Sequence, residues 1–161
     1  MAEEIERKFL VSKPGWHQPD LQGQRIVQGY LSSNAKATVR VRLIDDARAV
    51  LTIKGPAQGI SRSEFEYAIP LDDARSMLEL AKPHIVAKTR YEIPHGGHVW
   101  EVDVFEGAHE GLVVAEVELD SEDEAIDPPD WIGIEVSHDD RFANASLSRT
   151  PGVPSLDPDA A

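Results

Sequence analysis

Charged residues recur at every second position along this chain, in types that could bind a charged ligand together with metal ions. The first run is Glu4-Ile5-Glu6-Arg7-Lys8, in which two carboxylates and one ammonium are spaced two residues apart. Side chains two apart share one face of a β-strand, so these three would lie together while Ile5 faces the other way. The alternation returns in six later segments, at 39–43, 51–54, 63–67, 87–91, 100–104 and 115–119.

The charges in these segments are sorted by sign. The basic pairs are Arg40/Arg42 and Lys88/Arg90, and the acidic pairs are Glu64/Glu66, Glu101/Asp103 and Glu116/Glu118. Like charges stabilise a sheet surface only when opposite charges face them across the ladder. A solvated polar face is the alternative for any single strand. Repetition over so many strands favours a site lined by charges.

Turn-forming residues divide the chain into predicted strands at 3–11, 25–32, 37–44, 48–54, 62–69, 85–93, 98–105, 113–120 and 131–136. Apolar residues at helical spacing predict a helix over 71–82, and short helices are expected near 121–125 and 141–148. About eight strands close into a barrel whose interior holds side chains and a small ligand. We therefore predict an α+β fold: a closed or nearly closed eight-stranded antiparallel β-barrel, charged inside, with a few helices packed on the outside.

Composition narrows the class of protein. The 161 residues fit one domain, expected over 1–149, and the proline-rich tail at 150–161 is expected to be disordered. Lys and Arg total 16 and Asp and Glu total 29, so the net charge is 16 − 29 = −13, which gives no general attraction for nucleic acid or anionic membranes. The absence of cysteine excludes disulfides and thiolate metal sites. The start is acidic and no long apolar run follows, so we expect a cytoplasmic protein without a signal peptide or membrane span.

The ordered segments resemble those of the CYTH superfamily, also called triphosphate tunnel metalloenzymes. Glu4-x-Glu6-x-Lys8 is similar to the family's N-terminal ExExK signature. Further similar segments follow in order, at 39–42, 52–55, 61–67, 88–91, 100–105, 115–119, 133–136 and 140–142. The resemblance covers about residues 3–148 and is greatest to the small bacterial members, which act as inorganic triphosphatases. It implies metal-dependent hydrolysis of inorganic triphosphate to diphosphate and phosphate inside a charged tunnel.

Basic residues on the inward face could hold the phosphate oxygens of such a substrate, because arginine forks and lysine point charges both suit phosphate. This set is Lys8, Arg40, Arg42, Lys54, Arg62, Lys88 and Arg90. Each arginine could also pair with a carboxylate of an adjacent strand, and the two roles are compatible. The resemblance further implies that Lys8 and Tyr30 assist the chemistry. The alternative for Tyr30 is a buried ring with a satisfied hydroxyl.

Carboxylates make up the rest of the predicted lining. All-oxygen ligands without cysteine or clustered histidine favour Mg²⁺, or Mn²⁺, over zinc. The resemblance implies that the metal ligands are Glu4, Glu6, Glu64, Glu66, Glu116 and Glu118. Glu101 and Asp103 also face inward, and ion pairs with Lys88 and Arg90 on the neighbouring strand explain them equally well.

Other functions stay open at this point. The same site could hydrolyse an organic triphosphate, such as a nucleoside triphosphate or thiamine triphosphate, or cyclise ATP like a class IV-type adenylate cyclase. The chain could instead be a non-catalytic module that binds polyphosphate or triphosphate, although so many carboxylates argue against pure anion binding. The expected partner is a small-molecule triphosphate, with no nucleic acid and no membrane, and an apolar outer face would favour a homodimer.

Overall fold

Antiparallel strands make up most of the protein. The computed structural model describes residues 3–156, and in chain order its elements are β1 (Glu3–Val11), η1 (Pro14–Trp16), β2 (Gln24–Ser33), β3 (Thr38–Ile44), β4 (Arg48–Lys54), β5 (Ser61–Ile69), α1 (Leu71–Ala81), β6 (Ile85–His95), β7 (His98–Phe105), η2 (Gly107–His109), β8 (Val113–Glu118), β9 (Ile132–Glu135), η3 (Asp140–Phe142) and α2 (Asn144–Leu147). The η elements are short 3₁₀ helices. The predicted strands and the predicted helix over 71–82 are confirmed, with boundaries shifted by one or two residues. None of the described helices is long and apolar enough to cross a membrane.

One predicted helix is wrong. Residues 119–131 form an irregular segment with turns instead of starting a helix near 121–125. The Glu124 carboxylate accepts a hydrogen bond from the backbone N–H of Asp120 (2.8 Å) and pairs with the His98 ring, so its partners lie outside any helix. The prolines at 128 and 129 then prevent a helix from continuing. This segment covers the outer face of β7 and β8, where Ile126 and Trp131 pack.

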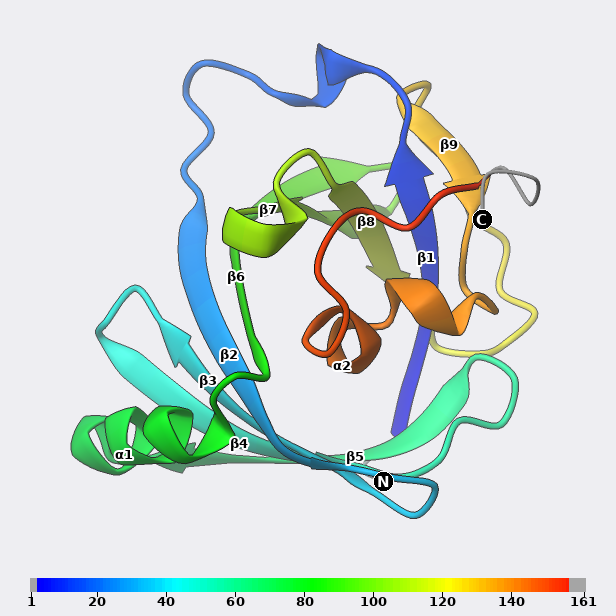
Figure 1. The fold of residues 1–161 in the computed structure, drawn as a ribbon. Coiled ribbons are helices and arrows are strands. Elements are labelled where there is room, and N and C mark those ends of the chain that lie inside the picture. Colours follow the sequence, from blue (N-terminus) through cyan, green and yellow to red (C-terminus); the bar gives the residue numbers. More distant parts are fainter. Residues whose placement is uncertain (1–2, 157–161) are drawn as a thin grey trace.

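Eight strands of the described chain close into a barrel, as the alternation predicts. Around the ring the order is β1-β5-β4-β3-β2-β6-β7-β8 and back to β1, with antiparallel neighbours throughout, while β9 pairs with β1 beside the ring (Figure 1). The β1–β5 pairing closes the ring and sets Glu4 opposite Arg62, and the β1–β8 pairing sets Lys8 opposite Glu116. Closure leaves the charged faces of all eight strands around one interior.

Apolar side chains on the outward faces form two layers that hold the strands in place. The first covers β1, β7 and β8 and consists of Phe9, Trp100, Val102, Ala115, Val117, Leu119 and Trp131. The second lies between α1 and the strands β3 and β4, and consists of Val41, Leu43, Ala49 and Ala74. Gly29 lets α1 approach β2 closely, because a Cβ at that position would lie 2.7 Å from the Cβ of Ala81.

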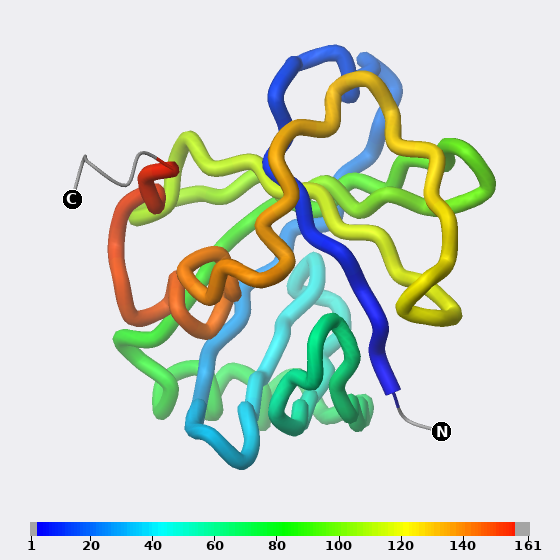
Figure 2. The backbone as a smooth tube through the Cα atoms, turned by 90° about the vertical axis from the view of Figure 1, so that its right-hand side faces the viewer, coloured from blue at the N-terminus to red at the C-terminus, as the bar shows by residue number. Residues whose placement is uncertain are grey.

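The C-terminal segment closes one end of the barrel. Elements η3 and α2 place Phe142 and Leu147 against Val86, Phe105 and Val114, which share the inward faces of their strands with the charged residues. Figure 1 looks into the ring with this orange to red segment across its near end, and Figure 2, turned by 90°, shows the segment at one side of the barrel. We call this apolar cluster the floor of the barrel.

The predicted tail at 150–161 begins directly after the floor. Within its described part, the backbone N–H of Gly152 donates to the carbonyl of Ala108 (2.8 Å), and His109 lies 3.0 Å from the carbonyl oxygen of Thr150. Residues 157–161 lie outside the described residues. The domain boundary at residue 149 and the disorder of the tail stay predictions.

Replacing Phe142 with Ala should lower the free energy of unfolding by about 3–5 kcal/mol, because the substitution removes a fully buried ring from the floor. Urea unfolding followed by tryptophan fluorescence measures the change. The control is Leu80→Ala on α1, where the side chain is 78% exposed and the change should stay within about 0.5 kcal/mol. A loss below about 1 kcal/mol for Phe142→Ala would contradict the packing of the C-terminal segment into the barrel.

Candidate active site

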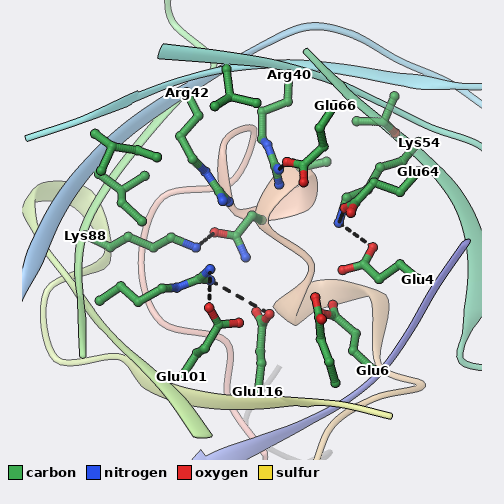
Figure 3. Close-up of a pocket in the computed structure, with 18 of the residues that line it drawn as sticks. Glu4, Glu6, Arg40, Arg42, Lys54, Glu64, Glu66, Lys88, Glu101 and Glu116 are labelled. Carbon is green, nitrogen blue, oxygen red and sulfur yellow. Dashed lines mark hydrogen bonds and ion pairs between the residues drawn. The ribbon is translucent and has the colours of Figure 1, made fainter. Parts of the chain in front are cut away.

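A polar cavity of about 450 Å³ lies inside the barrel above the floor (Figure 3). All the site residues predicted from the sequence line this cavity, namely Glu4, Glu6, Lys8, Tyr30, Arg40, Arg42, Lys54, Arg62, Glu64, Glu66, Lys88, Arg90, Glu116 and Glu118. Glu101 lines it as well, and Asp103 is fully buried. The spacing of charges in the sequence therefore located the lining, while the role of each residue stays a prediction.

Positive and negative charges occupy two contiguous halves of the barrel wall. The basic pairs come from β3 and β6, which flank β2, and Lys54 adds a charge from β4 next to them. Most of the carboxylates come from β7, β8, β1 and β5, which are neighbours on the other side of the ring. Lys8 and Arg62 lie among them, and Glu92 lies on β6. Figure 3 shows Arg42 and Lys88 on one side of the cavity and Glu6 and Glu116 on the other. We call these the basic half and the acidic half.

The basic half holds positive charge that nearby carboxylates do not balance. Arg42 forms no ion pair with any carboxylate of residues 3–156, and its Nε donates to Oε1 of Gln28 (2.8 Å). Burial, with repulsion from Arg40 and Arg90, lowers the pKa of Arg42 to about 10. The Nε of Arg40 is buried and donates to no described residue, although its terminal NH2 reaches Thr52 (3.1 Å) and lies 3.8 Å from the carboxylate of Glu66, so the charge of Arg40 is balanced only in part. Unsatisfied guanidinium donors fit an anion with several oxygens.

A buried ion-pair network anchors this half. Arg90 donates to both carboxylate oxygens of Asp103, from Nε at 2.7 Å and from NH2 at 2.9 Å, and Lys88 Nζ lies 2.7 Å from the same carboxylate. Burial raises the pKa of Asp103, but the two cations outweigh burial and hold that pKa below its usual value. Burial lowers the pKa of Lys88 to about 7 against the attraction of Asp103, helped by repulsion from Arg90 and Arg42. Asp103 is thus the counter-ion that positions two phosphate-binding candidates.

In the acidic half carboxylates outnumber cations, although Lys8 and Arg62 lie on the same strands. Burial, with repulsion from Glu116 and Glu4, raises the pKa of Glu6 well above its ordinary value. The pKa values of Glu64 and Glu118 are also raised, by burial first and then by repulsion from Glu4. A bound cation would stabilise the charged form of these carboxylates. The acidic half is therefore suited to metal ions.

Several carboxylates of this half already have basic partners, and these pairs include Lys54 with Glu64 (3.3 Å), Arg40 with Glu66 (3.8 Å) and Arg90 with Glu101 (3.2 Å). Lys54 Nζ lies 2.8 Å from Oε2 of Glu4, and although burial raises the pKa of Glu4, this ion pair lowers it overall. Glu116 faces Lys8 at 3.7 Å and Arg90 at 3.8 Å. Burial is outweighed again, and these cations hold the pKa of Glu116 well below its ordinary value. Glu4 and Glu116 would exchange an ammonium or guanidinium partner for a metal ion on binding one.

These carboxylates fit a metal ion that is shared with a substrate. Within residues 3–156, no group of three or more histidines and carboxylates is arranged to hold a metal ion by itself, and no histidine lines the cavity. Mg²⁺ needs only one or two carboxylates, because waters and phosphate oxygens complete its shell. The oxygen-only donors and the crowding of negative charge therefore match Mg²⁺ or Mn²⁺ that arrives with a phosphate ligand.

Two amide side chains that were not among the predicted residues, Gln28 and Asn144, also belong to the site. Gln28 is fully buried, and its Nε2 donates to the hydroxyl of Tyr30 (3.0 Å) and to Oδ1 of Asn144 (3.2 Å). The same oxygen of Asn144 accepts a hydrogen bond from Lys88 Nζ (2.9 Å). Strand alternation signals Gln28, because it shares a face with Tyr30. No sequence pattern signals Asn144, which reaches the cavity only through the packing of the floor.

Two residues that are predicted to bind the substrate, Lys8 and Arg62, donate hydrogen bonds to backbone carbonyls. Lys8 Nζ donates to the carbonyl of Phe142 (3.2 Å), and Arg62 donates from Nε and NH2 to the carbonyl of Gly55 (3.0 and 2.7 Å). Tyr30 is connected through the two amides to Lys88, and within residues 3–156 no hydrogen bond connects it to Lys8. The structure thus brings both lysines and Tyr30 into one cavity but links Tyr30 only to Lys88.

A closed antiparallel barrel with a basic half and an acidic half facing one cavity defines a class of protein, the charged β-barrel tunnels. The chain belongs to the CYTH domain family, whose members match it over residues 2–147.

Similar proteins cover almost the whole chain. An inorganic triphosphatase of Acetivibrio thermocellus is 43% identical over 152 residues, which is 94% of this chain and 96% of that protein. An inorganic triphosphatase of Nitrosomonas europaea is 34% identical over 149 residues, covering 90% and 96%. The crystal structure of the inorganic triphosphatase NE1496 superposes with a TM-score of 0.67 at 32% identity, over 94% of this chain and 99% of that one.

Glu101 gives stability a pH dependence that tests the electrostatics of the acidic half. Burial raises its pKa to about 7 against the attraction of Arg90, and repulsion from Glu116 and Asp103 adds to the rise. Because the folded-state pKa exceeds the unfolded value of 4.5, the folded protein loses stability as pH rises from about 4.5 to about 7. In EDTA, Glu101→Gln should therefore match the wild type at about pH 4 and be more stable by about 1–3 kcal/mol at about pH 8.

The control is Glu110→Gln, which neutralises an exposed carboxylate outside the cavity. Its stability should differ from the wild type by less than about 0.5 kcal/mol at both pH values. Urea unfolding at the two pH values measures both variants. An equal gain in the two variants, or no gain for Glu101→Gln at about pH 8, would contradict a shortage of cations in the acidic half.

Proposed function

We propose that this protein is a metal-dependent inorganic triphosphatase that hydrolyses inorganic triphosphate to diphosphate and phosphate inside the barrel. The observation that carries the proposal is the pair Arg40 and Arg42, whose partly unsatisfied guanidiniums face a half of the cavity crowded with carboxylates. A polyanion with bound cations supplies the missing charge on both sides. Similarity over nearly the full length of two inorganic triphosphatases supports the same substrate class.

The basic residues of the cavity would bind phosphate, and the carboxylates would bind the metal ion. Basic residues hold the phosphate oxygens, and the proposed set is Lys8, Arg40, Arg42, Lys54, Arg62, Lys88 and Arg90. The metal ion would be held by Glu4, Glu6, Glu64, Glu66, Glu116 and Glu118. When bound, Mg²⁺ or Mn²⁺ neutralises phosphate charge and lowers the pKa of a water molecule. Fixed cations beside the phosphates need no reorganisation as charge develops on the leaving group.

Tyr30 and a lysine are proposed to assist the reaction. The Tyr30 hydroxyl accepts a hydrogen bond from Gln28, so its own proton is free for a phosphate oxygen or a water in the cavity. Lys8 is the lysine that the family resemblance implies. Lys88 is a second candidate, because it shares the amide network with Tyr30 and its lowered pKa of about 7 suits proton transfer near neutral pH.

We further propose that the protein is cytoplasmic and forms a homodimer. An acidic chain without cysteine supports a cytoplasmic location. Phe65 on the outer face of β5 is 44% exposed and supplies apolar surface for the predicted homodimer. A monomer mass that stays constant over a wide range of protein concentration would rule out the dimer.

Phosphate and diphosphate release from a panel of substrates tests the function. With Mg²⁺, turnover of inorganic triphosphate should exceed that of ATP, thiamine triphosphate and long-chain polyphosphate by at least about tenfold, and EDTA should abolish it. Faster release from ATP or thiamine triphosphate would favour an organic triphosphatase, and cyclic AMP would favour a cyclase. Release from none of the substrates, with Mg²⁺ or Mn²⁺, would favour a binding module.

Tyr30→Phe should lower kcat for inorganic triphosphate by about 10²-fold with little change in KM, because the ring still packs while the proton is lost. The control is Tyr91→Phe, which alters a hydroxyl in the outer layer near Trp16 and should leave kcat unchanged. Lys8→Met and Lys88→Met then identify the lysine whose loss has a similar effect. A kcat for Tyr30→Phe within about twofold of the wild type would remove Tyr30 from the mechanism.

A further inference from the structure

We propose that Asn144 is a substrate-positioning residue that donates a hydrogen bond to the terminal phosphate at the closed end of the barrel. This inference rests on the proposed function. Asn144 lies on the floor and lines the cavity between Ala143 and Ala145. It is the only polar residue of α2 that does so, because Ser146 lines a separate cavity outside the barrel. The closing segment thus presents one polar side chain to the substrate.

The surrounding donors determine which way the Asn144 amide faces. Gln28 Nε2 can only donate, and it reaches Oδ1 of Asn144 at 3.2 Å; the Lys88 ammonium donates to the same oxygen at 2.9 Å. The orientation of Gln28 is set in turn by Arg42, a pure donor that must face the carbonyl oxygen of the Gln28 amide. The oxygen of Asn144 therefore faces Lys88 and Gln28, and its NH2 group faces another way.

The NH2 group of Asn144 has no acceptor in the described protein. Its neighbours in the network, Lys88, Gln28 and Arg42, present donors toward the floor, so a hydrogen-bond acceptor must come from the cavity. A phosphate oxygen beside Lys88 and Arg42 is such an acceptor. Because the amide of Asn144 is uncharged, it adds a hydrogen bond to the phosphate without changing the charge of the basic half or the acidic half.

Tyr30 belongs to the same hydrogen-bond network and also has a donor without an acceptor in the described protein. Its hydroxyl oxygen already accepts from Gln28, so its proton is free to point toward the cavity. Tyr30, Asn144, Lys88 and Arg42 can then all donate to one volume above the floor. A terminal phosphate has three non-bridging oxygens and the central phosphate has two, so the terminal group matches converging donors better. Triphosphate therefore binds with one chain end against α2.

Two substitutions separate the donor role of Asn144 from its structural role. Asn144→Ala removes both the acceptor and the donor without adding charge. Asn144→Asp keeps oxygen acceptors for Lys88 and Gln28, and it replaces the NH2 donor with an acceptor oxygen and adds one negative charge. Ser146→Ala is the matched control on the same helix, since that side chain lies outside the barrel.

Calorimetric titration with inorganic triphosphate in EDTA measures binding without turnover. We expect both Asn144 variants to bind at least about tenfold more weakly than the wild type, and Ser146→Ala to bind equally well. With Mg²⁺, KM should rise by the same factor while kcat changes less. Wild-type affinity and KM in Asn144→Asp would overturn the proposal, because they would leave Asn144 only the task of holding Lys88 and Gln28.

Hydrogen exchange on the wild-type protein gives a second measurement that needs no variant. Inorganic triphosphate in EDTA should slow amide exchange over residues 142–148, and unchanged exchange there would overturn the contact with α2. The wild type also separates the two proposals. If it hydrolyses triphosphate while the Asn144 variants keep its affinity and KM, only the role of Asn144 fails. If it neither binds nor hydrolyses triphosphate, the proposed function fails and this inference fails with it.

Discussion

Closing a sheet whose strands carry charge on one face forces those charges into a space that they cannot leave. Charges removed from water are tolerated only when they are paired or bound to ions. In this barrel only some of the charged side chains on the inner face are paired. Asp103 neutralises Lys88 and Arg90, and Lys54 reaches Glu4, but Arg42 on one side and Glu6 on the other keep unmatched charge. A metal-chelated polyanion is the ligand that would relieve both sides at once.

The rest of the fold keeps this arrangement rigid. Two apolar layers outside the barrel hold the strands, whose alternation gives the inward side chains defined positions. The floor, built on Phe142 and Leu147, closes one end and brings Asn144 up to the cavity. Such preorganisation matters because phosphoryl transfer depends mainly on positioning and charge neutralisation.

Strand faces could be predicted from the sequence because a period of two is a local property that tertiary packing does not alter. Glu64 and Glu66 follow this rule directly, and so does the Arg40/Arg42 pair. Spacing in the sequence could not predict the pKa values of the residues that line the cavity, because these values depend on partners across the barrel. Glu116 and Glu118 lie two residues apart on one strand, yet the pKa of Glu116 is lowered and that of Glu118 raised.

Features that depend on irregular backbone escaped prediction. Asn144 sits on a four-residue helix without periodicity, and only the burial of Leu147 brings it into the barrel. Residues 119–131 carry helix-starting signals, but Glu124 bonds to His98 and to the Asp120 backbone instead. At Glu124 the side-chain contacts outweigh local helix propensity, whereas the short helix expected near 141–148 does form, as η3 and α2.

The central claim is that opposite walls of one cavity bind opposite charges of one metal–triphosphate complex. Anomalous diffraction from crystals grown with Mn²⁺ and inorganic triphosphate tests this claim most directly. The account predicts a Mn²⁺ peak between phosphate oxygens and the carboxylates of β1, β5 and β8, with the triphosphate against Arg40 and Arg42. A triphosphate bound outside the barrel, or Mn²⁺ bound away from those carboxylates, would contradict it.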